Sequence, residues 1–166
     1  MSPEGACRRV EVRSSGIRQP SWLGTIPEVC EAALRRIAAV EWDLSILFCG
    51  DSEIAALHGR YLGSHAPTDV MSFSQRARRR VRLKPDRRIA GDIVISVSAL
   101  ARNARTYRCS KGEEAKRLLI HGILHLAGMD HGRGHGGSMR ALQERLVRAG
   151  GSAPKVGARG RGGTGT

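Results

Sequence analysis

The chain has 166 residues, 40% of them hydrophobic and 26% charged, which predicts one compact domain with a single hydrophobic core. Its formal charge of +13 favours a polyanionic partner such as RNA or DNA, although a GC-rich coding bias toward arginine would raise the charge equally well. No apolar run approaches the roughly 18 to 20 residues that cross a bilayer, and the first residues lack the apolar stretch of a secretory signal, so we expect a cytoplasmic protein with no membrane segment.

The first half of the chain shows hydrophobic patterns that alternate between strand and helix. A half-polar strand is expected over residues 7–13 because apolar side chains recur at every second position. A helix is expected over 25–40, since it opens with the capping-box sequence TIPE and continues with apolar residues at helical spacing. Residues 42–49 again have the period of a strand. A short helix capped by Asp51 is expected to follow and to end near Gly63.

The second half is predicted to hold two further strands and three further helices. The strand sequence AGDIVIS is apolar on both faces at its centre, which is typical of a buried inner strand. Beyond the last helix the chain is rich in glycine and arginine and has too few apolar residues to fold. We therefore predict a single domain over 1–149 and a disordered tail over 150–166. The expected strands are 70–73 and 89–96, and the expected helices are 96–107, 113–127 and 138–147.

Three of the six histidines fall within the segment HGILHLAGMDH. His121 and His125 are four residues apart on a predicted helix, so their side chains lie on one face and can share a metal ion. Gly128 can take the left-handed conformation that ends a helix, which lets the chain turn back and bring His131 to the same point. Three imidazoles suit one Zn²⁺ per chain and leave its fourth position for water, as catalytic zinc sites do. This spacing predicts that residues 1–149 are a metal-dependent hydrolase.

The residue after His121 is Gly122, and it separates this motif from the metzincin proteases that share its spacing. Those proteases have a glutamate there that acts as general base, and glycine has no side chain to do so. We therefore expect hydrolysis of a bond other than the peptide bond. Asp130 is the nearest carboxylate in sequence and is interpreted either as an orienting partner of a ligand imidazole or as an aid to proton transfer. His135 is expected to be an exposed loop residue rather than a fourth ligand.

The motif HGILHLAGMDH resembles that of the bacterial YbeY family of metal-dependent endoribonucleases, which act in rRNA maturation and ribosome quality control. Two further segments are similar to family motifs in the same order, PTDVMSF over 67–73 and GDIVIS over 91–96, and the resemblance extends over 44–147. It implies an α+β fold, with a small mixed sheet flanked by helices and a zincin-like metal helix, and zinc bound by His121, His125 and His131. The implied substrate is single-stranded rRNA precursor near the 3′ end of the 16S rRNA. The implied partners are the small ribosomal subunit and its assembly factors.

One departure from the family pattern concerns phosphate binding. The family usually has Tyr-Arg-Gly before its PTDV segment, and that arginine is expected to contact the substrate phosphate. Here the segment reads YLG, and Leu62 cannot bind a phosphate. Arg60 is the nearest replacement, although two helical positions differ by about 200° of rotation, and Arg76 is a second candidate. We assign catalytic roles to Arg60 and Asp130 as a hypothesis.

Three hypotheses of function remain open. The first is a zinc-dependent, single-strand-specific endoribonuclease, in which the metal and nearby arginines stabilise the negative charge that develops at phosphorus. The second is a non-catalytic RNA-binding ribosome assembly factor that keeps zinc for its structure, which Leu62 favours. The third is a metalloprotease, which Gly122 disfavours. Cleavage of single-stranded RNA, and its dependence on His121, separates the first two.

Overall fold

The computed structural model describes residues 6–66, 68–76, 85, 87–131 and 136–150. Within these ranges the chain forms a mixed α/β fold, in which one sheet is packed against several helices. The predicted tail beyond Gly150, together with Pro67 and His135, lies outside the described residues. Among the helices described, none has both the length and the apolar character that a bilayer crossing requires.

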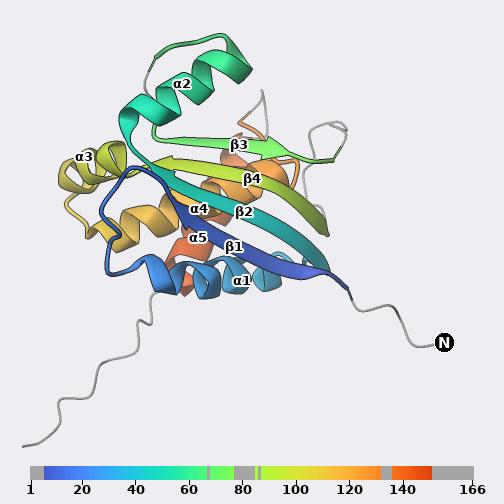
Figure 1. The fold of residues 1–166 in the computed structure, drawn as a ribbon. Coiled ribbons are helices and arrows are strands. Elements are labelled where there is room, and N and C mark those ends of the chain that lie inside the picture. The colour runs from blue at the N-terminus through green and yellow to red at the C-terminus, as the bar shows by residue number, and fades with distance from the viewer. Residues whose placement is uncertain (1–5, 67, 77–84, 86, 132–135, 151–166) are drawn as a thin grey trace, which may run out of the picture.

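The sheet has four strands in the order β1-β2-β4-β3 (Figure 1). Strands β1 (Arg8–Ser14), β2 (Glu41–Cys49) and β4 (Arg88–Ser96) run parallel to one another, whereas β3 (Val70–Ser74) runs antiparallel to β4 at the edge. All four strands lie close to their predicted positions. The sheet is therefore mixed, as the family resemblance implied.

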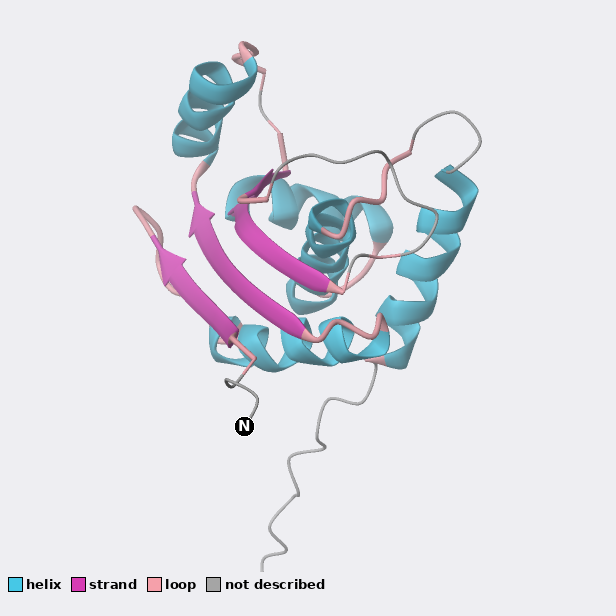
Figure 2. Cartoon of the chain, turned by 90° about the vertical axis from the view of Figure 1, so that its right-hand side faces the viewer, coloured by secondary structure: helices cyan, strands magenta, loops and turns pink. Residues whose placement is uncertain are grey.

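The helices cover the two faces of the sheet unequally. Helices α1 (Ile26–Arg36) and α4 (Lys111–Leu126) pack against one face, and α5 (Gly136–Ala149) packs on α4. Helix α3 (Val97–Tyr107) follows β4 and packs against α4, while α2 (Asp51–Leu62) lies at one end of the fold (Figure 2), where it contacts β4 and α3. On the second face Ile54 of α2 packs with Val94 and Met71.

The central strands account for the position of α4. On β2 the alternate residues Leu44, Ile46 and Phe48 are fully buried beneath the helices, which is the period-2 pattern that the sequence indicated. At the centre of β4, successive residues are buried on both faces, as an inner strand requires. Helix α4 lies over this strand with Leu119 and Ile123 in the main core, so its histidines are fixed relative to the sheet.

Two predicted helix starts are wrong in their capping. Thr25 does not cap α1, because it continues a short 3-10 helix, η1 (Leu23–Thr25), and its hydroxyl donates to the carbonyl of Trp22 at 2.7 Å. Asp51 does not cap α2 either, because Gly50 holds the N-cap position and the Asp51 carboxylate accepts from Arg102 at 2.8 Å. Each residue type suits a cap, but its side chain binds a partner other than the first helical amides, Trp22 for Thr25 and Arg102 for Asp51.

The end of α1 and the start of α4 also differ from their predicted positions. Helix α1 ends at Arg36 rather than near residue 40. Just beyond this end, Ala38 adopts a left-handed φ of 58°. A complete capping box begins α4, in which Ser110 accepts from the Glu113 amide at 3.1 Å and its own amide donates to the Glu113 carboxylate at 2.8 Å. This cap fixes the first turn of the helix that carries the histidines.

Candidate metal centre

The three histidines of the motif meet at one point. His121 and His125 lie one turn apart on α4, and the chain then turns at Gly128, whose φ of 84° is left-handed. His131 follows this turn, and one ligand nitrogen from each imidazole lies within 4.8 Å of the other two. The turn that the glycine predicted therefore brings the third imidazole to the first two, and together they could hold a metal ion.

The orientation of the rings fits a shared cation. Nδ1 of His121 lies 2.9 Å from Oε1 of Gln143, and because that amide oxygen only accepts, Nδ1 must carry the proton. Nε2 of His121 therefore presents a lone pair, and it faces Nε2 of His125 at 3.0 Å. Two lone pairs repel at this distance unless a proton or a cation lies between them. Nitrogens bound to one zinc at about 2.0 to 2.1 Å in tetrahedral geometry are about 3.3 Å apart, so the donor set fits such an ion.

Burial keeps His125 in the protonation state that a metal ligand requires. The pKa of the His125 imidazole is lowered, first because burial disfavours its charged form and next because His121 lies beside it. A neutral imidazole is the ligand form. The arrangement of the rings and the lowered pKa of His125 therefore both suit metal binding.

Gly122 faces the sheet. A β-carbon at this position would meet three atoms of the Ile93 side chain, the nearest at 3.1 Å. The glycine thus lets α4 approach β4 closely, and a glutamate built there would have to displace the core. The centre consequently has no general base at the metzincin position.

Asp130 is placed differently from the interpretation that it orients an imidazole. Its carboxylate is exposed and accepts a hydrogen bond from the backbone amide of His131 at 2.7 Å. The residue that orients a ligand ring is Gln143, which comes from α5. Asp130 therefore shapes the turn that carries His131 rather than the His121 ring.

A partly buried polar cluster lies one to two helical turns before His121. Glu114 is only 1% exposed and forms an ion pair with Arg117, with Nε and Nη2 of the guanidinium at 2.8 and 2.6 Å from its oxygens. The side-chain amide of Asn103 donates to both Glu114 and Asp69 at 3.0 Å. Asp69 belongs to the PTDV segment, so this cluster joins that segment to α3 and α4.

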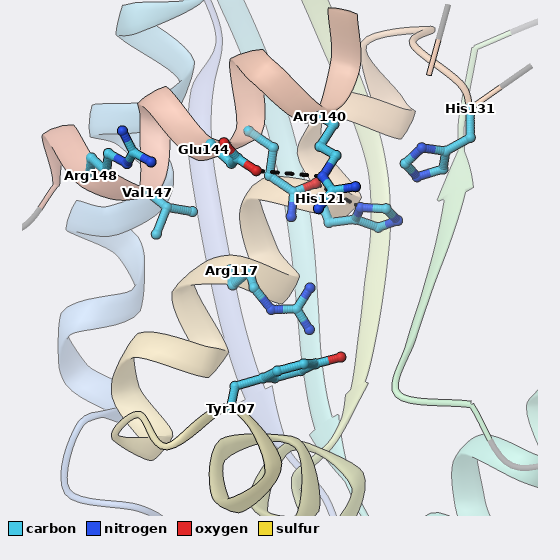
Figure 3. A pocket seen from close by; sticks show the side chains of 9 residues that line it. Tyr107, Arg117, His121, His131, Arg140, Glu144, Val147 and Arg148 are labelled. Carbon is cyan, nitrogen blue, oxygen red and sulfur yellow. Dashed lines mark hydrogen bonds and ion pairs between the residues drawn. The ribbon is translucent and has the colours of Figure 1, made fainter. Parts of the chain in front are cut away.

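A pocket of about 450 Å³ opens beside the histidines. Figure 3 shows Tyr107 and Arg117 on one side of it, residues of α5 on the other, and His121 with His131 at one end. Arg117 and Tyr107 were not predicted from the sequence as residues of the site. The signal for Arg117 was its spacing of four residues before His121, which places both side chains on one face of α4. Among the described residues, those that line it are Tyr107, Arg117, His121, His131, Arg140, Gln143, Glu144, Val147 and Arg148.

The two arginines proposed as replacements for the family arginine do not line this pocket. Arg60 is exposed near the C-terminal end of α2. Arg76 follows β3 and donates to the carbonyl of Arg88 at 2.7 Å. Leu62 is 59% exposed at the end of α2. The structure thus brings neither Arg60 nor Arg76 into the lining that His121 and His131 share.

Together, the fold and the histidine triad define a small mixed α/β protein with a site suited to one metal ion. A sequence model of the family described as endoribonuclease YbeY matches residues 10–151. The chain is 41% identical over 141 residues to an endoribonuclease YbeY of Treponema pallidum, covering 84% of this chain and 88% of the relative. A relative of the same name from Syntrophotalea carbinolica is 35% identical and covers 73% of this chain and 79% of its own. The chain therefore belongs to the YbeY family.

The fold agrees with a solved structure. The solution structure of a Thermotoga maritima protein superposes with a TM-score of 0.61, at 21% sequence identity, over 84% of this chain and 87% of the other. At this identity the likeness shows the fold alone. It supports the mixed sheet and helices described above.

Proposed function

We propose that the protein is a metal-dependent endoribonuclease that cleaves single-stranded rRNA precursor, near the 3′ end of the small-subunit 16S rRNA, and serves rRNA maturation and ribosome quality control in the cytoplasm. The observation that carries this proposal is the triad of His121, His125 and His131 beside an arginine-lined pocket, in a chain of the YbeY family. The small ribosomal subunit and its assembly factors are the partners that such a substrate implies.

The three imidazoles would hold the ion through nitrogens that already face one another. Zinc is the ion proposed, since three neutral imidazoles with an open fourth position match its catalytic sites, and the arrangement corresponds to a zincin-like metal helix. Such an ion would supply Lewis-acid stabilisation of charge at the scissile phosphate and activation of a nucleophile. Gln143 holds the His121 ring, and Asp130 holds the backbone at His131.

The remaining work at phosphorus falls to cations and to proton acceptors of the chain. Asp130 lies beside the triad, where it binds the His131 amide and acts on the charge of His125, which supports a catalytic role for it better than for Arg60, exposed on α2. Arg117 lines the pocket beside His121, which supports it over Arg60 as the guanidinium that faces the substrate. Peptide hydrolysis is not proposed, because position 122 faces Ile93 and carries no base.

The experiment compares the purified, metal-loaded chain with a His121→Ala variant on a labelled single-stranded rRNA fragment. We expect endonucleolytic cleavage by the wild type and a loss of at least about 100-fold in the variant, because one of three ligands is removed. Cleavage that survives His121→Ala would refute metal catalysis by this site. RNA binding without cleavage in both proteins would instead favour a non-catalytic assembly factor, and digestion of casein but not RNA would indicate a protease.

A further inference from the structure

The pocket beside the metal centre has the size and walls of a ligand site. Its volume of about 450 Å³ falls within the range of roughly 300 to 1,000 Å³ typical of small-molecule sites. One end carries two of the three histidines, so a group in the pocket would lie next to a phosphate held at the metal. The other walls come from α5 and from Tyr107 and Arg117 (Figure 3).

Arg117 is held in a fixed orientation. Two of its three guanidinium nitrogens bind the buried Glu114, and Asn103 holds that carboxylate in turn. Nη1 has no hydrogen-bond partner among the described residues, and the side chain remains 34% exposed. A planar cation fixed in this way presents its remaining N–H groups to an anion without the entropy cost of ordering a free side chain.

Tyr107 adds a flat apolar surface to the same wall. Its side chain is 61% exposed, although it ends helix α3 within the pocket lining. The Arg117 guanidinium carbon lies over the ring, 5.2 Å from its centroid, so a cation–π contact fixes the ring and covers one of its faces, and a base would stack on the other face. Exposed aromatic rings of this kind are the surfaces on which proteins stack single-stranded bases.

The charges of the pocket suit a phosphodiester. Three arginines line the pocket, Arg117, Arg140 and Arg148, and the nearby carboxylates are Glu144 in the lining and Glu114, which pairs with Arg117. These side chains together carry a net charge of one positive unit before any metal ion is counted. Tyr107 and Val147 add apolar side chains to the same lining. A nucleotide combines these two chemistries, since it has an apolar ring and a negative phosphate.

We infer that this pocket binds the nucleotide next to the cleaved phosphodiester, with the base against the Tyr107 ring and its phosphate on Nη1 of Arg117. This inference rests on the proposed function, because it takes RNA as the substrate. Arg117 then supplies from α4 the guanidinium that Leu62 cannot supply from α2. Arg140 and Arg148 attract the backbone at the rim of the pocket.

The test measures binding and not cleavage. The metal-loaded chain is titrated into a fluorescent, single-stranded 2′-O-methyl RNA oligonucleotide, which resists cleavage, and fluorescence anisotropy gives Kd. Tyr107→Leu is expected to weaken binding about tenfold or more, because stacking contributes ~1 to 3 kcal/mol per base. Tyr107→Phe keeps the ring and is expected to stay within about twofold of wild type. The matched control is Tyr61→Leu on α2, where the tyrosine is 60% exposed, and its Kd is expected to be unchanged.

A second pair of variants tests the phosphate contact. Glu114→Gln/Arg117→Gln removes the cation without leaving a buried carboxylate unpaired, and it is expected to lower the slope of log Kd against log salt concentration by about 0.7. The control is Glu31→Gln/Arg35→Gln, an exposed ion pair on α1 with N···O of 3.0 Å. Thermal melting and zinc content verify that each variant is folded and loaded.

The outcomes separate this inference from the proposed function. Equal weakening by Tyr107→Leu and Tyr61→Leu, or no weakening by Tyr107→Leu and no change of slope, would overturn the nucleotide pocket even if the wild type cleaves RNA. Binding that depends on Tyr107 and Arg117 in a chain that never cleaves RNA would keep the pocket and refute the nuclease.

Discussion

Gln143 reaches the metal centre from a different helix than the histidine it binds. Its side-chain oxygen lies 2.9 Å from Nδ1 of His121, and this hydrogen bond decides which ring nitrogen presents a lone pair to a metal ion. Partners of this kind hold the ligand ring in place and raise its basicity. A residue outside the triad would thus control how well an ion binds there.

Replacement of Gln143 tests that control. Gln143→Leu is expected to weaken zinc affinity about 10- to 100-fold, because the His121 ring loses its acceptor and can rotate or change tautomer. Competition with a chromophoric chelator measures the affinity. Gln143→Glu keeps an acceptor at the same position and should retain wild-type affinity or exceed it. An unchanged affinity in Gln143→Leu would show that the hydrogen bond does not orient the ring.

The spacing between Arg117 and His121 predicts that the two side chains share a helix face, although Arg117 was not among the predicted site residues. The family pattern places the phosphate-binding arginine at position 62, where this chain has Leu62, and Arg60 was predicted in its place because it is near in sequence. The relevant neighbour in space lies on the histidine helix, four residues before His121. Helical periodicity contained this information, since positions four apart share a face, but only the pocket lining shows that the face is open.

At the scale of elements, the close approach of α4 to the sheet depends on two glycines. Gly122 of α4 faces Ile93, and Gly91 of β4 lies against the Phe73 carbonyl oxygen and the Leu126 side chain. A side chain at Gly122 would press on Ile93 of β4, and one at Gly91 would meet the Phe73 backbone of β3 as well as Leu126 of α4. The histidines on α4 therefore keep their place over the sheet because these positions have no β-carbon.

Gly91→Ala is expected to destabilise the fold by about 2 kcal/mol or more. The added methyl meets a backbone carbonyl oxygen, which cannot move aside as a flexible side chain can. The free energy of unfolding in urea measures the effect. Gly24→Ala is the matched control, because a β-carbon there has nothing within 4 Å, and its effect should remain within about 0.5 kcal/mol. Equal stability of the two variants would contradict the close packing of α4 on β4.

The elements that depend on hydrophobic period were predicted well, and those that depend on distant partners were not. Strand β4 is buried on both faces, as its continuous apolar centre indicated. The start of α2 was misassigned because Asp51 binds Arg102, 51 residues away. For the same reason the sequence placed His121 and His125 on one helix face but could not find Gln143, whose position depends on how α5 packs on α4.

At the scale of the whole molecule, the metal centre joins α4 to the chain after its C-terminal turn. His131 follows Gly128, and α5 begins at Gly136, so an ion bound by all three histidines ties the turn to the helix. Because the three nitrogens converge only in the folded chain, metal binding and folding are linked.

Zinc should therefore raise the melting temperature. At a free concentration 100 times Kd, binding to the folded state alone adds about 2.7 kcal/mol, which corresponds to a rise of roughly 5 to 10 °C for a domain of this size. Thermal melting followed by circular dichroism, with and without zinc, measures the shift. His125→Ala should lose more than half of it. A shift of the same size in that variant would mean that zinc stabilises the protein at another site.

The central claim, that one metal ion on the three histidines is required for RNA cleavage, is tested most directly by titration. Metal-free protein receives zinc from zero to two equivalents, and the initial rate of cleavage of a single-stranded rRNA fragment is measured at each point. The rate should rise in proportion to zinc and reach its plateau at one equivalent per chain, with His131→Ala failing to reach it. Full activity before any metal is added, or the same plateau in His131→Ala, would contradict the claim.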